Sequence, residues 1–512
     1  GESVPYLDDY LSRSNRYGKP AMPYPPGPRP FPLIGNLLDI PQSKYALTWT
    51  KMGEKHGPLI WLTIPGQTIL VLNSFEAAKE LLEKRPLTFV DRPRFVMAVE
   101  LMGLGNYLPL SLYNDTYKKQ RSHLKHALSA AVVRSDYSRL LETKARQYVE
   151  RCAARPENII PETTRIIGEA IIQLTYGKLE NKRGRDYIQI TTRLLEIMIV
   201  SLQGYVVDVF PVVQYLPSWL PGMKFKRDAA RWRKEISELE ATVFENVKEN
   251  MRMQDLQNKH QERQNVQQVL DDEMLLSFSG LQIFLGKSAF LTEATMQSFI
   301  RAMTIFPSIQ KKAQAEIDRV IGSNRLPTFE DQPDLPYIHA VVLEIMRWNP
   351  VLPVDVPHTS RRDEVYDGYF IPKGTGVIAN AWGFSRDSKY YTNPSTFDPE
   401  RYLKQPPELD PREFVFGYGR RTCPGKEFGF QEVWILVASI FWAFEVVGTE
   451  DGPESFEDAD LFSFGMVKWV AASLRLVGAG LILDALSRPI PFKCRFVPRR
   501  EGLKDTSSFA TA

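Results

Sequence analysis

Apolar residues recur at helical spacing over most of the chain, which predicts a mainly α-helical protein. This spacing covers residues 75–85, 230–255, 294–322 and 336–348. Shorter runs rich in β-branched and aromatic residues are typical of strands, and they read TILVLNS from Thr68, EVYDGYFIP and TGVIANA. No Gly/Ser linker or internal repeat divides the chain. The pattern therefore predicts one principal domain that is mainly α with a small β region.

The composition narrows the class of protein. The chain has 512 residues, of which 43% are hydrophobic, and this is enough to bury a large core. Its formal net charge of +3 is too small to indicate nucleic-acid binding. Its three cysteines, Cys152, Cys423 and Cys494, are too few and too scattered for a disulfide framework or a zinc site. We therefore expect the domain to face a reducing compartment.

One cysteine lies in a loop with the properties of a metal-binding thiolate. The sequence FVFGYGRRTCPGKEFGF places Phe416, Gly419, Arg421, Cys423 and Gly425 before a predicted helix. Glycines on both sides let the backbone approach a ligand closely, and Arg421 can meet a carboxylate such as a haem propionate. Backbone N–H groups at the helix start stabilise a thiolate. A thiolate ligand on haem iron favours O–O cleavage, so the loop indicates oxygen activation.

These five positions resemble the signature of the cytochrome P450 superfamily, and the cytochrome P450 fold is the fold that this resemblance implies. The resemblance extends from Pro25 to about Pro498. It is closest to fungal microsomal (class II) members, including the O-methylsterigmatocystin oxidoreductase-like group. It implies haem b (iron protoporphyrin IX) with Cys423 as the axial, metal-binding and catalytic ligand. Phe416, Gly419, Arg421 and Gly425 then belong to the cofactor-binding set.

A second group of residues matches a structural network of the same family. Glu344 and Arg347 are three residues apart in YIHAVVLEIMRW and so share a helix face. Alone they would be taken as an exposed ion pair, worth about 0.2–0.5 kcal/mol. With Arg401 of FDPERYL they resemble the buried Glu-Arg-Arg network that holds the haem-binding core. An arginine fork that bridges two segments fixes geometry and does no chemistry.

Two further residues resemble partners of the haem propionates. Arg121 stands at the arginine of the W-x-x-x-R pattern, although Tyr117 replaces the usual tryptophan. A tyrosine can still pack on the haem edge and offer a hydrogen bond. His358 stands where many members place a second propionate partner, and a surface histidine is the alternative. The apolar segments Leu352–Val356 and Val96–Tyr113 match substrate-contact regions and indicate a lipophilic substrate.

The helix expected on the oxygen side departs from the family pattern. Counted back from FIRAMTIFPSIQKKAQAEID, the usual Ala/Gly-Gly-x-Asp/Glu-Thr-Thr falls on Lys287, Ser288, Ala289, Phe290, Leu291 and Thr292. The acid and the first threonine, which normally relay protons, are missing. Thr292 remains as the catalytic candidate, rotated by about 100° around the helix.

A second departure is the apolar run MVKWVAASLRLVGAGLILDA at 466–485, which replaces a short β connection. Its charges make a membrane span a poor interpretation, and an amphipathic surface helix or translated noncoding sequence are the alternatives. Together the two departures leave three hypotheses. The first is that the protein acts as an isomerase, dehydratase or peroxide-using enzyme. The second is that it is a weakly coupled monooxygenase, and the third is that the written sequence is imperfect at these positions. A haem-binding protein with impaired catalysis is a further alternative.

The resemblance also sets the expected function and organisation. It implies a monooxygenase that inserts one oxygen atom from O2 into a lipophilic small molecule of fungal secondary metabolism or xenobiotic oxidation. Electrons come from NADPH through a reductase, for which Arg420 and Lys426 are docking candidates. The expected location is the cytosolic face of the endoplasmic reticulum membrane, with the anchor absent from the sequence as written and no nucleic-acid partner. The predicted divisions are an N-terminal segment (1–22), a proline-rich hinge (23–36), the catalytic domain (37–500) and a tail (501–512).

Overall fold

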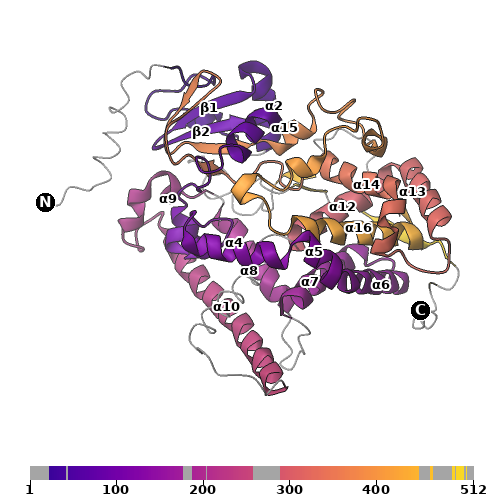
Figure 1. Ribbon diagram of the computed structural model, residues 1–512. Helices are drawn as coiled ribbons and strands as arrows, with labels where there is room; N and C mark the ends of the chain where they lie inside the picture. Colours follow the sequence, from indigo (N-terminus) through magenta and orange to yellow (C-terminus); the bar gives the residue numbers. More distant parts are fainter. Residues whose placement is uncertain are drawn as a thin grey trace.

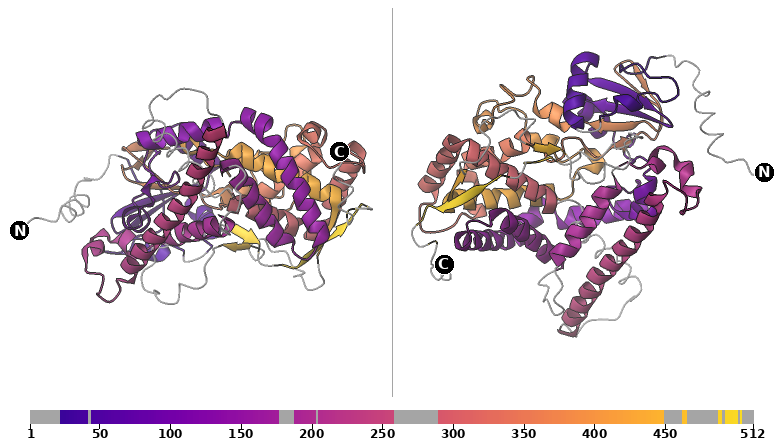
Figure 2. Two further views of the ribbon diagram at one scale, coloured as in Figure 1. Left: turned by 90° about the horizontal axis from the view of Figure 1, so that it is seen from below. Right: turned by 180° about the vertical axis from the view of Figure 1, so that it is seen from behind.

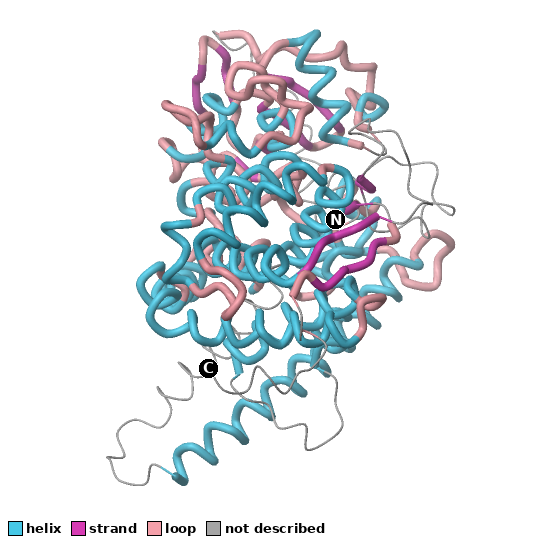
Figure 3. Tube along the Cα trace, turned by 90° about the vertical axis from the view of Figure 1, so that its right-hand side faces the viewer, coloured by secondary structure: helices cyan, strands magenta, loops and turns pink. Residues whose placement is uncertain are grey.

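The computed structural model describes residues 22–41, 44–176, 187–202, 204–257, 289–448, 462–464, 487–489, 492–500 and 503. Helices dominate these residues, and the strands gather mainly at one end of the molecule (Figures 1 and 3). The expectations for residues 1–21, for Lys287 and Ser288, for the 466–485 run and for 504–512 lie outside the described residues. The predicted mainly α fold with a small β region is confirmed.

The α-helices within these ranges include one long member, α10, which extends away from the rest of the structure (Figure 2). Their bounds are α2 (Tyr45–His56), α3 (Phe75–Ala78), α4 (Asp115–Ala127), α5 (Ala130–Val132), α6 (Ser138–Ala154), α7 (Ile159–Tyr176), α8 (Tyr187–Ser201), α9 (Val206–Val209), α10 (Lys224–Gln257), α12 (Ala289–Ile305), α13 (Pro307–Val320), α14 (Pro336–Trp348), α15 (Ala381–Ser385) and α16 (Lys426–Ala443). Short 3-10 and π helices connect them, among them η2 (Lys79–Glu83), η3 (Val96–Leu101), η6 (Pro211–Tyr215), η9 (Pro399–Tyr402), η10 (Pro411–Glu413) and η11 (Gly419–Arg421).

The strands form one four-stranded sheet, in the order β1-β2-β6-β3, and three two-stranded sheets. β1 and β2 are antiparallel, whereas β2 and β6 are parallel and so join segments far apart in the sequence. The bounds are β1 (Leu59–Ile64), β2 (Gln67–Leu72), β3 (His358–Thr359), β4 (Glu364–Tyr366), β5 (Tyr369–Ile371), β6 (Gly376–Ala379), β7 (Phe444–Gly448), β8 (Phe462–Phe464), β9 (Ser487–Pro489) and β10 (Cys494–Pro498).

Helix α16 forms the centre of the largest core. Every residue from Phe430 to Ala443 is buried, because the helix is apolar on all sides and is enclosed by α6, α12, α13 and α14. The continuous helical pattern predicted over 294–322 is two helices, α12 and α13. Pro307 has no N–H to donate and is therefore the first residue of the second helix.

The proline-rich segment lies against the sheet. The Pro26 carbonyl accepts a hydrogen bond from the Trp61 backbone N–H at 2.8 Å. The Tyr24 ring stacks on the Trp61 ring with centroids 5.1 Å apart. The segment from Pro23 to Pro30 contains no helix, as its prolines predict. No helix within the described ranges is both long and apolar enough to cross a membrane.

Candidate functional site

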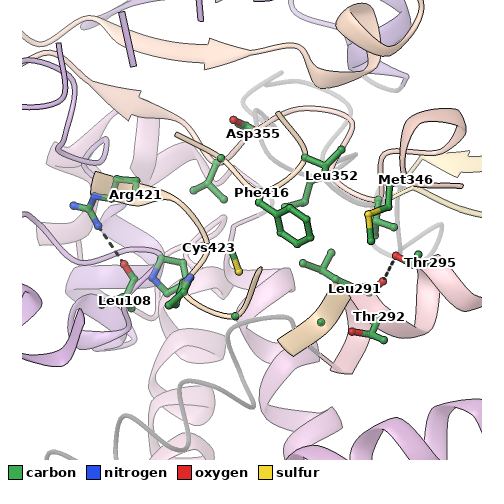
Figure 4. Close-up of a pocket in the computed structure, with 18 of the residues that line it drawn as sticks. Leu108, Leu291, Thr292, Thr295, Met346, Leu352, Asp355, Phe416, Arg421 and Cys423 are labelled. Atoms are coloured by element: carbon green, nitrogen blue, oxygen red, sulfur yellow. Dashed lines mark hydrogen bonds between the residues drawn. The ribbon is translucent and has the colours of Figure 1, made fainter. Parts of the chain in front are cut away.

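A cavity lies between the loop that precedes α16, the start of α12 and the segment that follows α14 (Figure 4). It contains about 1230 Å³ of empty space, part of which is open to solvent. The cavity walls combine one cysteine thiol, one cluster of charged side chains and several apolar side chains. The apolar ones include Leu108, Leu291, Met346, Leu352, Val356 and Phe416.

The Cys423 side chain borders the cavity beside the Phe416 ring (Figure 4). The Cys423 backbone N–H donates to the Phe416 carbonyl at 2.7 Å, which closes the loop. A side chain at Gly425 would place its Cβ 3.9 Å from the sulfur, so the backbone passes close to it. α16 begins three residues after Cys423, and its free N–H groups favour negative charge on the sulfur. The thiol is free of disulfides and partly exposed.

Gly419 allows the same loop to pack closely against η2. Its φ of +50° lies in the left-handed region, and a Cβ there would approach the Leu82 carbonyl oxygen to 2.7 Å. A side chain would therefore push the cysteine loop away from η2. The signature glycine thus positions the loop against the rest of the fold.

Cationic side chains gather at one end of the cavity. Arg92, Arg121 and Arg421 line it, and Asp355 is the one carboxylate among the described lining residues. Burial and then the neighbouring Arg421 and Arg121 lower the pKa of Arg92 to about 9. Burial likewise lowers the pKa of Arg421. Three guanidiniums beside one carboxylate leave a local excess of positive charge that two anionic groups would balance.

Backbone carbonyls hold these arginines in place. Arg421 donates to Val90, Leu108 and Ser111 carbonyls at 2.7, 3.2 and 2.8 Å. Arg92 donates to the carbonyls of Pro109, Val356 and Pro357 at 2.9, 2.7 and 2.9 Å. The Arg121 guanidinium donates to the Thr422 carbonyl, in the cysteine loop itself. Each guanidinium has five N–H donors, so each retains donors for an anion in the cavity.

Tyr117 lies next to this cluster on α4. Asn114 caps that helix by accepting the Tyr117 backbone N–H at 2.8 Å, and the i, i+4 spacing then places Tyr117 and Arg121 on one face. The Tyr117 hydroxyl donates to the Arg420 carbonyl at 2.9 Å, and its ring lies 4.1 Å from the Arg421 guanidinium carbon. The tyrosine therefore connects α4 to the cysteine loop in place of the usual tryptophan.

His358 also lines the cavity, but its charge differs from that of the arginines. Its Nδ1 lies 2.7 Å from the Phe89 carbonyl, which can only accept a proton, so Nδ1 carries the hydrogen. Burial, Arg92 and Arg421 lower the pKa of His358 well below its ordinary value. The neutral ring then offers an acceptor at Nε2. Its expected role as a propionate partner thus requires uptake of a proton.

The residues around the cavity fit haem b. A thiolate candidate faces the cavity at Cys423, and three guanidiniums against one carboxylate leave an excess that matches two propionates. Arg92, Arg121 and Arg421 would hold the propionates, and Cys423 would hold the iron. The apolar wall would cover the macrocycle. Cofactor and substrate would share this cavity.

The three network residues predicted from the sequence come together in the interior behind the cavity. Glu344, Arg347 and Arg401 have fully buried side chains. Arg347 donates to both Glu344 oxygens, and Arg401 donates to one of them at 3.1 Å. The two arginines also bind the Thr396 carbonyl, at 3.1 and 3.0 Å. The network joins α14 to the segment that contains η9, which leads into the cysteine loop.

The start of α12 supplies the opposite wall. Leu291, Thr292 and Thr295 line the cavity, so the rotated Thr292 does reach it (Figure 4). The Thr295 hydroxyl donates to the Leu291 carbonyl at 2.8 Å and is satisfied within its own helix. On this wall, Thr292 therefore has the hydroxyl best placed to exchange a proton with a molecule bound in the cavity.

Sequence reasoning missed four residues at or near this site: Arg92, Thr295, Asp355 and Glu432. Arg92 lies in a segment of mixed composition, where nothing separates it from surface charges, and Asp355 lies within the Leu352–Val356 segment that was predicted to contact substrate but was not itself singled out. Glu432 had a usable signal, because it directly precedes the largely apolar run from Val433 to Ala443 in the same predicted helix. A charge in a helix that is apolar on all sides is buried, and a buried charge needs an explanation.

Comparison with known proteins supports one family. The Cytochrome P450 family model matches residues 25–468. Cytochrome P450 monooxygenase claR of Ampulloclitocybe clavipes is 32% identical over 96% of this chain and 88% of its own length. Cytochrome P450 monooxygenase 45 of Postia placenta is 35% identical over 94% and 89%. Cytochrome P450 monooxygenase ppsD of Aspergillus oryzae is 33% identical over 86% of both chains.

Proposed function

The chain belongs to the cytochrome P450 family and is a haem-thiolate monooxygenase, and we propose that its substrate is a lipophilic small molecule of fungal secondary metabolism. The observation that carries the proposal is the cavity, in which the Cys423 side chain and an apolar wall border one space. The fungal monooxygenases that resemble the chain over most of their length support the same biological setting.

Each part of the cavity has a distinct task. Cys423 would hold haem, which would supply activation of O2 because thiolate donation favours O–O cleavage. The arginine cluster would bind the propionates. Leu291, Leu352 and Val356 would exclude water and contact an apolar substrate in the cavity. Thr292 exchanges protons with the cavity through its hydroxyl.

A substrate panel tests this proposal. Purified, haem-loaded protein is supplied with NADPH and a fungal reductase, and apolar terpenoid or polyketide compounds are compared with polar analogues of equal size. Incorporation of one ¹⁸O atom from ¹⁸O2 into an apolar compound is the expected result, and Cys423→Ser should abolish it. Turnover confined to polar compounds, or ¹⁸O supplied only from water, would contradict the proposal.

We also propose that the reductase docks beside the cysteine loop. Arg420 is exposed there, and its Nη1 donates to the Tyr113 hydroxyl at 2.8 Å. Lys426 is the first residue of α16, and its Nζ lies 5.7 Å from the Phe416 ring centre. Electrons would thus enter close to the sulfur. Arg420→Glu should slow reduction by NADPH and weaken its salt dependence, whereas reduction by dithionite should be unchanged.

Membrane association is proposed on a separate surface. Large apolar side chains are exposed around η6, namely Phe210, Val212, Tyr215, Leu216 and Trp219. Others, Phe31, Leu33, Ile34 and Leu38, follow the proline-rich segment. The β1–β2 turn joins the two groups, since Gln67 donates to the Asp208 carbonyl at 3.3 Å. We place this face on the endoplasmic reticulum membrane. Flotation with vesicles of that lipid composition should decrease for Trp219→Ser with Leu33→Ser.

A further inference from the structure

Asp355 is an acid in an apolar part of the cavity wall. It is 7% exposed, and Leu352 and Val356 of the same segment line the cavity with it. It is the one carboxylate among the described lining residues, and Figure 4 shows it at a different side of the cavity from Thr292. Small-molecule sites are mostly apolar, and their few polar groups fix the orientation of the ligand. Asp355 is therefore a candidate for recognition of one polar group of the substrate.

The backbone around Asp355 is held by hydrogen bonds to other segments. The Asp355 N–H donates to the Ala379 carbonyl of β6 at 3.0 Å. The carbonyl of the next residue, Val356, accepts a hydrogen bond from Arg92 Nη1 at 2.7 Å. The position of the carboxylate is thus set by the fold, so a ligand would not have to order this segment on binding.

The effect of Asp355 on the arginine cluster is secondary. Burial and then Arg421 lower the pKa of Arg92, and Tyr117 and then Asp355 oppose this change. Burial lowers the pKa of Arg421, and Tyr117 and Asp91 oppose that change. A carboxylate has about four acceptor positions, so Asp355 can influence its neighbours and still accept a hydrogen bond from a molecule in the cavity.

The charges around the cavity indicate that the partner of Asp355 is neutral. Arg92, Arg121 and Arg421 line the cavity, and Asp355 together with two haem propionates would balance their positive charges. His358 adds no charge, because burial and two of these arginines hold its pKa well below the ordinary value. A cationic substrate would disturb this balance. A hydroxyl group, in contrast, donates a hydrogen bond to a carboxylate without changing the net charge.

We propose that the substrate carries a hydroxyl group on an otherwise apolar frame, and that Asp355 accepts a hydrogen bond from this hydroxyl. The inference rests on the proposed function and names the substrate class within it. Leu352 and Val356 would contact the apolar frame beside the carboxylate. A site that binds a hydroxyl discriminates against an analogue without one, because the buried acceptor then loses that hydrogen bond. Asp355 is thus a specificity-determining residue and has no part in oxygen activation.

Calorimetric titration of the haem-loaded chain tests this recognition without catalysis. The probes are farnesol, geranylgeraniol and dodecanol, each compared with its own methyl ether. The wild type should bind at least one alcohol about tenfold more tightly than its ether, because a hydrogen bond to a charged group is worth at least this much. In Asp355→Leu the ether should bind at least as tightly as the alcohol. An equal affinity for alcohol and ether in every pair, or no binding of any alcohol, would overturn the proposal.

Further probes and variants exclude the other roles of this acid. Asp355→Asn keeps an oxygen acceptor and should retain part of the preference, whereas the exposed acid Asp363 provides the matched control Asp363→Asn, which should bind as the wild type does. Farnesylamine should bind more weakly than farnesol, and tighter binding of the amine would show that the partner is a cation. Haem transfer to apomyoglobin should be equally fast in the wild type and Asp355→Asn. Faster haem loss with an unchanged preference for alcohols would assign Asp355 to the arginine cluster and overturn the proposal.

The outcomes also separate the role of Asp355 from the function on which it rests. Turnover confined to polar compounds would defeat the proposed function. Turnover of lipophilic compounds, with the same preference for alcohols in Asp355→Leu and the wild type, would defeat the role of Asp355 alone. The carbon monoxide difference spectrum of each variant shows that it has folded around haem.

Discussion

The Arg347 guanidinium donates two hydrogen bonds to the Glu344 carboxylate, at 2.8 and 2.7 Å, and both side chains are completely buried. Burial lowers the pKa of Arg347, but the Glu344 carboxylate raises it further, so the net change is upward. The Arg347 guanidinium therefore stays charged in the folded protein. The remaining Arg347 N–H groups donate to the Ser385, Pro394 and Thr396 carbonyls and so fix the segment that leads to the cysteine loop.

The first prediction concerns this pair. Glu344→Gln leaves the buried Arg347 guanidinium without a counter-charge, whereas Arg401 keeps the Glu408 carboxylate at 2.6 Å. Breaking a buried pair in this way destabilises by about 3–5 kcal/mol. The urea midpoint should fall, and haem content should fall with it because the loop loses its support. Glu400→Gln removes the partner of Lys312 in an exposed pair and should stay within about 0.5 kcal/mol. Equal midpoints for the two variants would contradict a structural role for the network.

The second prediction concerns Arg92, which no motif singled out. Arg92→Leu removes one of the positive charges proposed to hold the propionates. A hydrogen bond to a charged group is worth about 1.5–3 kcal/mol, so haem affinity should fall roughly 10- to 150-fold. Transfer of haem to apomyoglobin measures this change.

The matched control for Arg92 is Arg94, two residues away, whose guanidinium pairs with Glu100 at the surface. Arg94→Leu should leave haem transfer unchanged. If both variants lose haem at the same rate, the effect lies in the local backbone and the assigned role of Arg92 is wrong.

The third prediction is a pH dependence of stability caused by Glu432. Its folded-state pKa of about 8 lies above its ordinary value of 4.5, so between these pH values the native state holds a proton that the unfolded state has lost. Stability should therefore decline as pH rises through this window, by about 1.4 kcal/mol per pH unit. The contribution is fully present below pH 4.5 and is lost above pH 8.

Glu432→Gln removes this titration. In urea unfolding, the free energy of unfolding of Glu432→Gln should rise relative to that of the wild type as pH increases from 6 to 8. The free energy of unfolding of Glu293→Gln should change with pH as that of the wild type does. A parallel pH dependence in Glu432→Gln and the wild type would show that Glu432 is ionised in the folded protein.

The fourth prediction separates the two contacts of Tyr117. Tyr117→Phe loses the hydroxyl bond to the Arg420 carbonyl but keeps the ring against Arg421, so it should cost about 0.5–1.5 kcal/mol with haem retained. Tyr117→Ala loses both contacts and should lower haem content. Thermal unfolding and haem absorbance measure the two effects, and equal haem loss in both variants would assign the main role to the hydroxyl.

The sequence predicted the parts of the site that motifs encode. The cysteine loop, the Glu344 network and Arg121 were found because fixed residue types stand at fixed spacings. The strand β2 and helix α14 were found because local periodicity reports local structure. The break between α12 and α13 was also readable, since Pro307 is a reliable first helical residue.

The missed residues depend on tertiary structure. Arg92 becomes part of the site only because the Val356 and Pro357 carbonyls, more than two hundred residues away, bind its guanidinium. His358 was predicted as a propionate partner, but its neutral state follows from burial and from two arginines, Arg92 and Arg421, that folding brings beside it.

The carbon monoxide difference spectrum of the dithionite-reduced full chain tests the central claim most directly. The account predicts a Soret band at the red-shifted position of a thiolate-ligated haem, and its loss in Cys423→Ser. A wild-type band at the position of a neutral ligand, or no haem band at all, would contradict the assignment of Cys423 and with it the proposed function.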